Sequence, residues 1–144
     1  MNRFSILSLA AVLALSAPPA IAQQAAAPTA ISRVTLFRIP AGQRPAFDKD
    51  MKENVFPIWE AEKKAGIIVS YSVYGATPRT PQDADIILTI TYKNMAALDG
   101  LEERTDAIDK QIFGSLDDAN KGAISREQMR SVIGSDLIRE LISK

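Results

Sequence analysis

Alternating apolar and polar positions predict three β-strands. The first covers residues 32–39, which are rich in β-branched and aromatic side chains and are followed by a proline and a glycine. The second and third cover residues 67–75 and 84–93. The loop between them, residues 76–83, contains two prolines and is too long for a tight hairpin turn.

The second and third strands each predict one apolar face and one face that carries hydroxyl groups. The apolar face consists of Ile67, Val69, Tyr71, Val73, Ile86, Leu88, Ile90 and Tyr92. The opposite face carries Ile68, Ser70, Ser72, Tyr74, Ile87, Thr89 and Thr91. An apolar face is typical of a sheet that helices cover. The other face is unusual both for a core and for open solvent, so we expect it to meet a second sheet or to line a cavity.

Apolar residues at helical spacing predict two longer helices. The first covers residues 45–65, and Gly66 is a suitable residue to end it. Pro57 predicts a kink or break within this helix, because proline has no backbone N–H to donate. The second helix begins after Asn94, a good N-cap, and ends at Gly114.

The C-terminal part predicts a connector, a short helix and a last strand. Residues 117–124 have the pattern of a connector. Ser125 and Gln128 form a capping box that predicts a helix over residues 125–133. In residues 135–142 the spacing of the apolar side chains favours a helix, whereas the topology requires a strand. We expect the strand.

The beginning of the chain has the pattern of a signal peptide over residues 1–22. Arg3 supplies the positive charge, residues 4–17 are apolar, and residues 20–22 offer the small-x-small pattern of a cleavage site. The apolar run is shorter than the roughly 20 residues that span a bilayer, so we expect cleavage and no later membrane contact. A flexible leader over residues 23–31 and one domain over residues 32–144 would follow, in the periplasm or secreted.

The amino-acid composition excludes several classes of catalytic and metal-binding site. The sequence has no histidine and no cysteine. This excludes a Ser-His-Asp triad, His-ligated haem or zinc, a thiolate nucleophile, an iron–sulfur cluster and disulfides. The 17 basic and 17 acidic side chains balance, so we expect no nucleic-acid partner. We expect Glu102, Glu103, Asp106 and Asp109 to form a solvated helix face.

A metal site and a cofactor are not expected. Residues 117–128 are similar to an EF-hand loop, with Gly122 at its sixth position. Positions three, five and twelve are Ala119, Lys121 and Gln128. Three side-chain ligands are therefore missing and a cation stands inside the loop, so calcium binding is not predicted.

The order strand, helix, strand, strand, helix, extra helix, strand is the split βαβ or ferredoxin-like plan, an α+β fold with an antiparallel four-stranded sheet and helices on one face. Residues 33–42, followed by an amphipathic helix, resemble the opening of dimeric α+β barrel proteins, which include antibiotic-biosynthesis monooxygenases, EthD-like and NIPSNAP-like proteins. Residues 55–59, 64–66 and 70–74 resemble an exported branch of that superfamily. The resemblance implies a homodimer whose two sheets close a barrel, and a pocket between each sheet and its own helices.

A few aromatic and polar residues could line such a pocket. The candidate ligand-binding residues are Arg38, Asn54, Trp59, Tyr71 and Tyr92. Aromatic walls with few polar groups suit a small apolar or aromatic ligand. Arg38 lies on an alternating strand and could point inward, where it needs an anionic ligand or a carboxylate of the first helix as partner. Alternatively, the aromatic residues belong to the core.

Three functions follow from these observations. The first is the binding of a small apolar or aromatic molecule by an exported dimer. The second is a cofactor-independent oxygenase, isomerase or lyase acting on a small aromatic substrate, with Arg38 and a tyrosine stabilising an anion. The third is a structural or accessory dimer whose own side chains fill the pocket.

Overall fold

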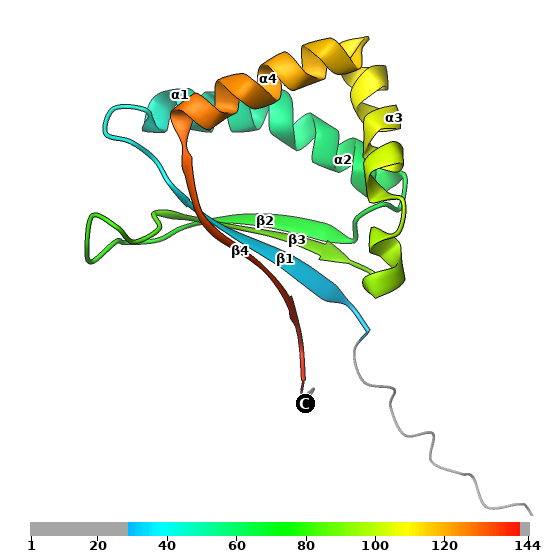
Figure 1. Ribbon diagram of the computed structural model, residues 1–144, viewed down its shortest axis with the longest axis horizontal. Coiled ribbons are helices and arrows are strands. Elements are labelled where there is room, and N and C mark those ends of the chain that lie inside the picture. The colour runs from blue at the N-terminus through cyan, green and yellow to red at the C-terminus, as the bar shows by residue number, and fades with distance from the viewer. Residues whose placement is uncertain (1–28, 142–144) are drawn as a thin grey trace, which may run out of the picture.

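The computed structural model describes residues 29–141, in which a four-stranded antiparallel sheet has its helices on one face (Figure 1). The strands are β1 (Ile31–Arg38), β2 (Ser70–Gly75), β3 (Ile86–Tyr92) and β4 (Ser131–Arg139), in the order β2-β3-β1-β4. This topology confirms the predicted ferredoxin-like fold class. The predicted signal peptide and residues 23–28 of the predicted leader lie outside the described residues.

The core lies between the sheet and the first helical segments. Phe47 and Ile86 are each only 1% exposed, and both belong to the larger of two buried clusters. The other buried members of that cluster are Phe37, Ile39, Met51, Val55 and Leu88. The smaller cluster contains Ile31, Ile67, Ile68 and Tyr92. Within residues 29–141, no helix has the length and apolar character needed to cross a bilayer.

The first predicted helix is interrupted where Pro57 indicated. It consists of α1 (Arg44–Asp50), a π-helical segment η1 (Met51–Val55) and α2 (Phe56–Lys64). The backbone N–H of Phe56 donates to the carbonyl of Met51, five residues earlier. This wider turn lies directly before the proline, which cannot donate to any carbonyl of the preceding turn.

The end of α2 confirms the role predicted for Gly66. This glycine has a φ of 73°, a left-handed conformation that suits glycine. Its N–H donates to the carbonyl of Lys63 (3.1 Å), and the N–H of Ile67 donates to the carbonyl of Glu62 (2.9 Å). The two bonds form a Schellman motif. The motif turns the chain toward β2 and fixes the last turn of α2.

The second predicted helix is divided in two. Asn94 caps a short 3₁₀ segment, η2 (Met95–Leu98), by accepting a hydrogen bond of 3.0 Å from the N–H of Ala97. Gly100, with a φ of 59°, then leads into α3 (Leu101–Phe113), and Gly114 ends this helix as expected.

The predicted connector over residues 117–124 is wrong, because this segment is the first part of α4 (Leu116–Met129). The helix begins at Ser115, whose Oγ accepts from the N–H of Asp118 (3.1 Å) and donates to its carboxylate (2.8 Å). Ser115 and Asp118 thus provide the N-terminal capping that we assigned to Ser125 and Gln128. Ser125 lies inside the helix.

The predicted helix over residues 125–133 ends too late, and the predicted last strand begins too late. The strand itself is confirmed: β4 starts at Ser131 and pairs with β1 as far as Ile31 opposite Arg139. Leu36 lies opposite Gly134, whereas Phe37 lies opposite Val132, so one extra residue of β4 forms a bulge. Position 142 of the predicted strand lies outside the described residues.

The two predicted sheet faces are largely confirmed. Tyr71 and Val73 pack against the buried clusters under the helices. The predicted alternation fails only at the start, because β2 begins at Ser70 and Val69 is 51% exposed, while Ile67 and Ile68 are both buried before the strand. The opposite face brings together Ser32, Ser70, Thr91, Val34, Ser72 and Thr89, as the strand register shows. The helices leave this face uncovered (Figure 1).

Candidate functional site

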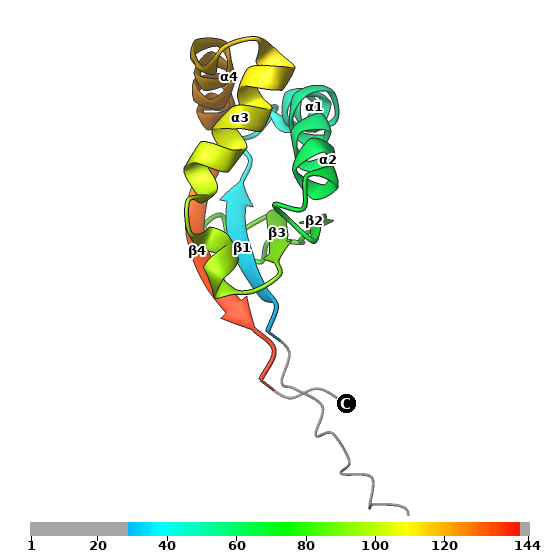
Figure 2. The ribbon, with the colours of Figure 1, turned by 90° about the vertical axis from the view of Figure 1, so that its right-hand side faces the viewer.

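A cavity of about 950 Å³ lies between the sheet and the helices. In the side view, α1 and α2 form one part of the helical layer above the sheet and α3 and α4 the other part (Figure 2). The apolar walls include Phe37, Ile58, Trp59, Leu88, Ile90 and Tyr92. The cavity has the size and the apolar lining of a site for a small organic molecule.

Trp59 is held in place by two other aromatic rings. Its ring centroid lies 5.0 Å from that of Tyr71 and 6.0 Å from that of Phe56. The hydroxyl of Tyr71 donates to Glu60 Oε1 at 2.7 Å, on the outer side of α2. Tyr71 therefore supports the cavity wall from behind, while Trp59 itself faces the cavity.

The structure brings two of the five candidate residues to the cavity, Trp59 and Tyr92. Tyr71 lies behind Trp59. Asn54 donates to Asp50 Oδ1 (2.8 Å) and does not line the cavity. The inward orientation expected for Arg38 is wrong: its guanidinium donates to the carbonyl of Pro81 at 2.8 Å, outside the cavity.

The orientation of Arg38 follows from the face that β1 turns to the helices. Phe37 is buried in the larger cluster, so its neighbour Arg38 points to the other face of the strand. The same alternation brings Arg33 and Thr35 to the cavity. Arg33 is therefore the arginine of β1 that reaches the site.

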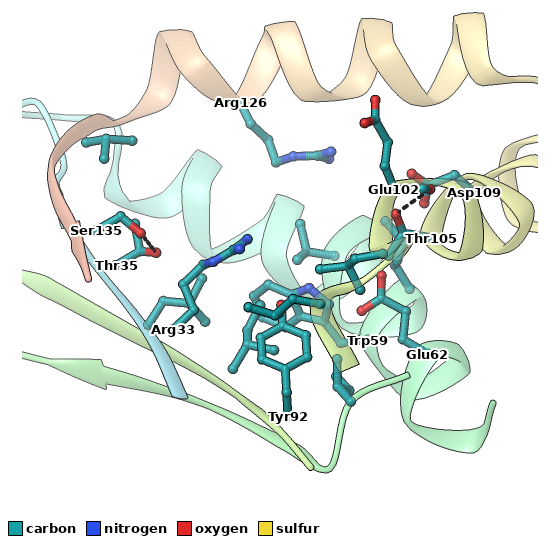
Figure 3. Close-up of a pocket in the computed structure, with 18 of the residues that line it drawn as sticks. Arg33, Thr35, Trp59, Glu62, Tyr92, Glu102, Thr105, Asp109, Arg126 and Ser135 are labelled. Carbon is teal, nitrogen blue, oxygen red and sulfur yellow. Dashed lines mark hydrogen bonds between the residues drawn. The ribbon is translucent and has the colours of Figure 1, made fainter. Parts of the chain in front are cut away.

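Three arginines line the cavity, Arg33 of β1, Arg126 of α4 and Arg130. Figure 3 shows the side chains of Arg33 and Arg126 directed into it. Arg126 pairs with Asp50 at 3.7 Å. The guanidinium carbon of Arg130 lies 4.4 Å from the ring centroid of Phe37, and burial lowers the pKa of Arg130. Within residues 29–141, neither Arg33 nor Arg130 forms an ion pair with a carboxylate. Arg33 and Arg130 could thus pair with the anionic group of a molecule in the cavity.

Two carboxyl groups from different helices also line the cavity, Glu62 of α2 and Asp109 of α3 (Figure 3). Glu62 is only 7% exposed. Burial and the charge of Asp109 raise the pKa of Glu62 to about 7. Burial and the charge of Asp106 also raise the pKa of Asp109, and Arg126 opposes this shift.

The solvated helix face expected on α3 is only partly correct. Glu102 and Glu103 are exposed, at the rim of the cavity. Asp106 is half-buried, and Asp109 lines the cavity with a buried carboxylate oxygen that has no hydrogen bond within the described residues. The expectation for Asp109 was wrong because α3 turns this residue toward α2.

Tyr92 is linked electrostatically to an arginine and to a carboxyl group of the cavity. The guanidinium carbon of Arg33 lies 6.0 Å from the centroid of its ring. Burial and the charge of Glu62 raise the pKa of Tyr92, while Arg33 lowers it. The phenol therefore stays protonated at neutral pH and can donate a hydrogen bond into the cavity.

The charged lining residues were not among the sequence candidates. For Glu62 a signal existed, because it follows Val55 and Ile58 at the helical spacing of the buried stripe. Arg33 shares its strand face with Phe37, so the choice of face for β1 would have identified it. Arg126 gave no signal, because the helix that carries it was expected to start only at Ser125.

Comparison with known proteins supports the fold. No protein-family model and no curated protein matches the chain. Among solved structures, HapK from Hahella chejuensis is similar with a TM-score of 0.53 and 17% identity, covering 79% of this chain and 95% of that chain. A dimeric ferredoxin-like protein from an uncultured marine organism is similar with a TM-score of 0.54 and 16% identity, covering 80% and 97%. The chain thus has a ferredoxin-like fold, shared with these solved structures.

Proposed function

We propose that the protein binds a small, flat, largely apolar or aromatic molecule that carries an anionic group. The observation that carries this proposal is the cavity itself: Trp59 and Tyr92 provide aromatic walls, and Arg33 and Arg130 line it without a carboxylate partner within residues 29–141. A partly buried guanidinium is costly unless an anion compensates it. The aromatic walls favour a flat ligand body through apolar burial and ring contacts.

The cavity argues against a purely structural role. In a structural dimer the protein's own side chains would fill the space between sheet and helices. Here a volume of about 950 Å³ stays open, with charged groups among its lining residues. Native cores are closely packed, and an open, charged cavity of this size is typical of a ligand site.

We also propose that the protein is a homodimer in which the uncovered sheet faces of two copies pack together. This face combines hydroxyl groups with half-buried Val34 and Leu36 and with exposed apolar side chains such as Tyr74 and Ile138. Such a mixed surface suits a symmetric contact with its own copy. The similar protein from the marine organism is described as dimeric.

The export of the protein is a further part of the proposal, and it rests on the pattern of residues 1–22. Intact-mass measurement of the protein recovered from the periplasm of a Gram-negative host tests it. We expect a chain that starts near Gln23. A cytoplasmic protein that keeps its first residues would contradict export without affecting the binding site.

Ligand binding can be tested with a matched pair of probes, naphthoate and its uncharged amide, naphthamide, by calorimetric titration. We expect naphthoate to bind more tightly. Arg33→Gln should weaken naphthoate binding about tenfold, equivalent to about 1.4 kcal/mol, and leave naphthamide unchanged. Arg38→Gln is the matched control on the other face of β1 and should bind like the wild type.

The location of the bound probe has its own readout. Trp59 is the single tryptophan of the chain and lines the cavity, so its fluorescence should change with one naphthoate per protomer. Absence of binding by both probes would refute the proposed function. Equal binding of both probes, with no effect of Arg33→Gln, would refute the anionic part of it.

A further inference from the structure

Glu62 is a buried carboxyl group that opens into the cavity and has no ion pair within residues 29–141. It lies in the last turn of α2, which the Schellman motif fixes through the carbonyl of Glu62 itself. The charged and titratable groups that share the cavity with it are Asp109, Glu102, Glu103, Arg126, Arg130, Tyr92 and Arg33. A carboxyl group that only supported the fold would be expected to have a hydrogen-bonding or ionic partner.

The surroundings of Glu62 keep both of its protonation states accessible near neutral pH. Burial and the charge of Asp109 raise its pKa from 4.5 to about 7. A group whose pKa is close to the working pH is suited both to accept and to return a proton. Opposite it, the phenol of Tyr92 and the guanidinium of Arg33 provide hydrogen-bond donors and positive charge (Figure 3).

We propose that Glu62 is the general base of a cofactor-independent proton transfer on the molecule in the cavity, an inference that rests on the binding function proposed above. The substrate class is a small conjugated ketone, aromatic or enone-like, with an acidic C–H next to its carbonyl. The ketone is uncharged when it binds, and it becomes the anion that the arginines accommodate when the proton leaves. The same site thus suits anionic ligands and a neutral substrate that turns into an enolate.

The step balances without any further reactant. The Glu62 carboxylate takes the proton from the carbon, the C–H electron pair forms the C=C bond of an enolate, and the carbonyl oxygen takes the negative charge. Arg33 and Tyr92 stabilise this oxygen by charge and hydrogen bonding. Protonated Glu62 then returns the proton to another carbon of the conjugated system. The product is an isomer of the substrate, and the carboxylate is restored.

Nitrobenzisoxazole is a suitable probe, because a base opens this flat aromatic molecule by removing a single proton from carbon. The C–H electron pair forms a nitrile, the N–O bond breaks, and the pair of that bond leaves on a coloured phenolate. Each turnover thus reports one proton transfer. We expect the wild-type rate to exceed the rate in buffer, to rise with pH and to level off above an inflection near pH 7.

Variants separate a chemical role of Glu62 from a structural one. Glu62→Gln should lower the rate of probe opening on the order of 100-fold and remove its pH dependence. Glu62→Asp should retain part of the rate, and its rate should still show an inflection with pH. Glu53→Gln, at an exposed position of the same helical region, should behave like the wild type. Asp109→Asn should move the inflection to lower pH, because it removes a negative charge next to Glu62.

The outcomes distinguish this inference from the binding proposal. If naphthoate binds, and Glu62→Gln still binds it but opens the probe as fast as the wild type, Glu62 is not the base and the binding proposal stands. If naphthoate binds but the wild type does not open nitrobenzisoxazole faster than buffer does, the role of Glu62 as the base is likewise refuted and the binding proposal stands. If neither naphthoate nor naphthamide binds, both proposals fail.

Discussion

Glu62 of α2 and Asp109 of α3 line the same cavity, and burial together with the charge of Asp109 raises the pKa of Glu62. The fold thus brings two carboxyl groups from different helices to one site. Two such groups cannot both ionise freely. Burial and the charge of Asp106 also raise the pKa of Asp109, and the charge of Arg126 opposes this shift, whereas no cation among the described residues offsets the rise in the pKa of Glu62. Glu62 therefore holds its proton up to neutral pH.

The stability of the protein should fall with rising pH because of Glu62. Its pKa is higher in the folded protein, about 7, than its ordinary value of 4.5, so the folded state binds the proton more tightly than the unfolded state. Between about pH 4.5 and pH 7 the wild type should lose on the order of 2 kcal/mol relative to Glu62→Gln. Urea unfolding at several pH values measures this. Glu53→Gln should keep the wild-type slope, and an unchanged slope in Glu62→Gln would contradict the prediction.

The stability of the protein should depend on Ile86, which is 1% exposed in the larger buried cluster. Ile86→Ala should reduce the free energy of unfolding by about 2–5 kcal/mol, because it removes buried methyl groups and leaves a cavity. Ile124→Ala, at a position on α4 that is 61% exposed, is the matched control and should change it by at most about 0.5 kcal/mol. Chemical denaturation of both variants decides this, and similar losses in the two would be inconsistent with the described core.

The start of α4 can be tested by replacing two serines, Ser115 at the observed start and Ser125 at the predicted start. Ser115→Ala removes the N-cap and should destabilise the protein by about 1 kcal/mol. Ser125→Ala, inside the helix, should be neutral or slightly stabilising, because alanine is the better helix former. Thermal unfolding of the two variants measures the difference. The opposite order would mean that the helix begins at Ser125.

The proposed dimer makes a prediction for the centre of the uncovered sheet face. Thr89 lies between Val34 and Ser72 there, so Thr89→Arg should place a charge in the contact and give a monomer. Gln111→Arg, on the exposed side of α3, should remain dimeric. Light scattering at several protein concentrations measures the mass. A wild type that is monomeric throughout would refute the dimer.

The elements with a strong local signal could be predicted from the sequence. Alternation defined β1, β2 and β3, Gly66 and Gly114 marked helix ends, and Pro57 marked the interruption before α2. For β4 the local pattern favoured a helix, and only the topology indicated a strand. The start of α4 could not be read from local signals, because Ser125 with Gln128 matches the capping box, whereas the cap that forms, Ser115 with Asp118, lacks its Glu or Gln. Packing decides between them: Ala119, in the first turns of α4, is buried.

Which arginine of β1 reaches the cavity depends on which face of β1 lies toward the helices, and the alternation of its residues does not decide this. On β1, Val34 and Leu36 make one face apolar, and Phe37 makes the other face apolar as well. The pattern alone therefore does not decide whether Arg38 or Arg33 lies toward the helices. Trp59 and Tyr92 could be chosen because aromatic residues suit either a core or a ligand wall. The carboxyl groups required knowledge of how α2 and α3 meet.

The pairing of Ile31 with Arg139 has a practical consequence for protein engineering. Since the outer ends of β1 and β4 are neighbours, a short linker could join them without disturbing the sheet. New termini could then be opened in the exposed segment around Thr80, between β2 and β3. Such a circular permutant would keep every strand neighbour while its chain order changes, so tags could be moved to the opposite end of the sheet.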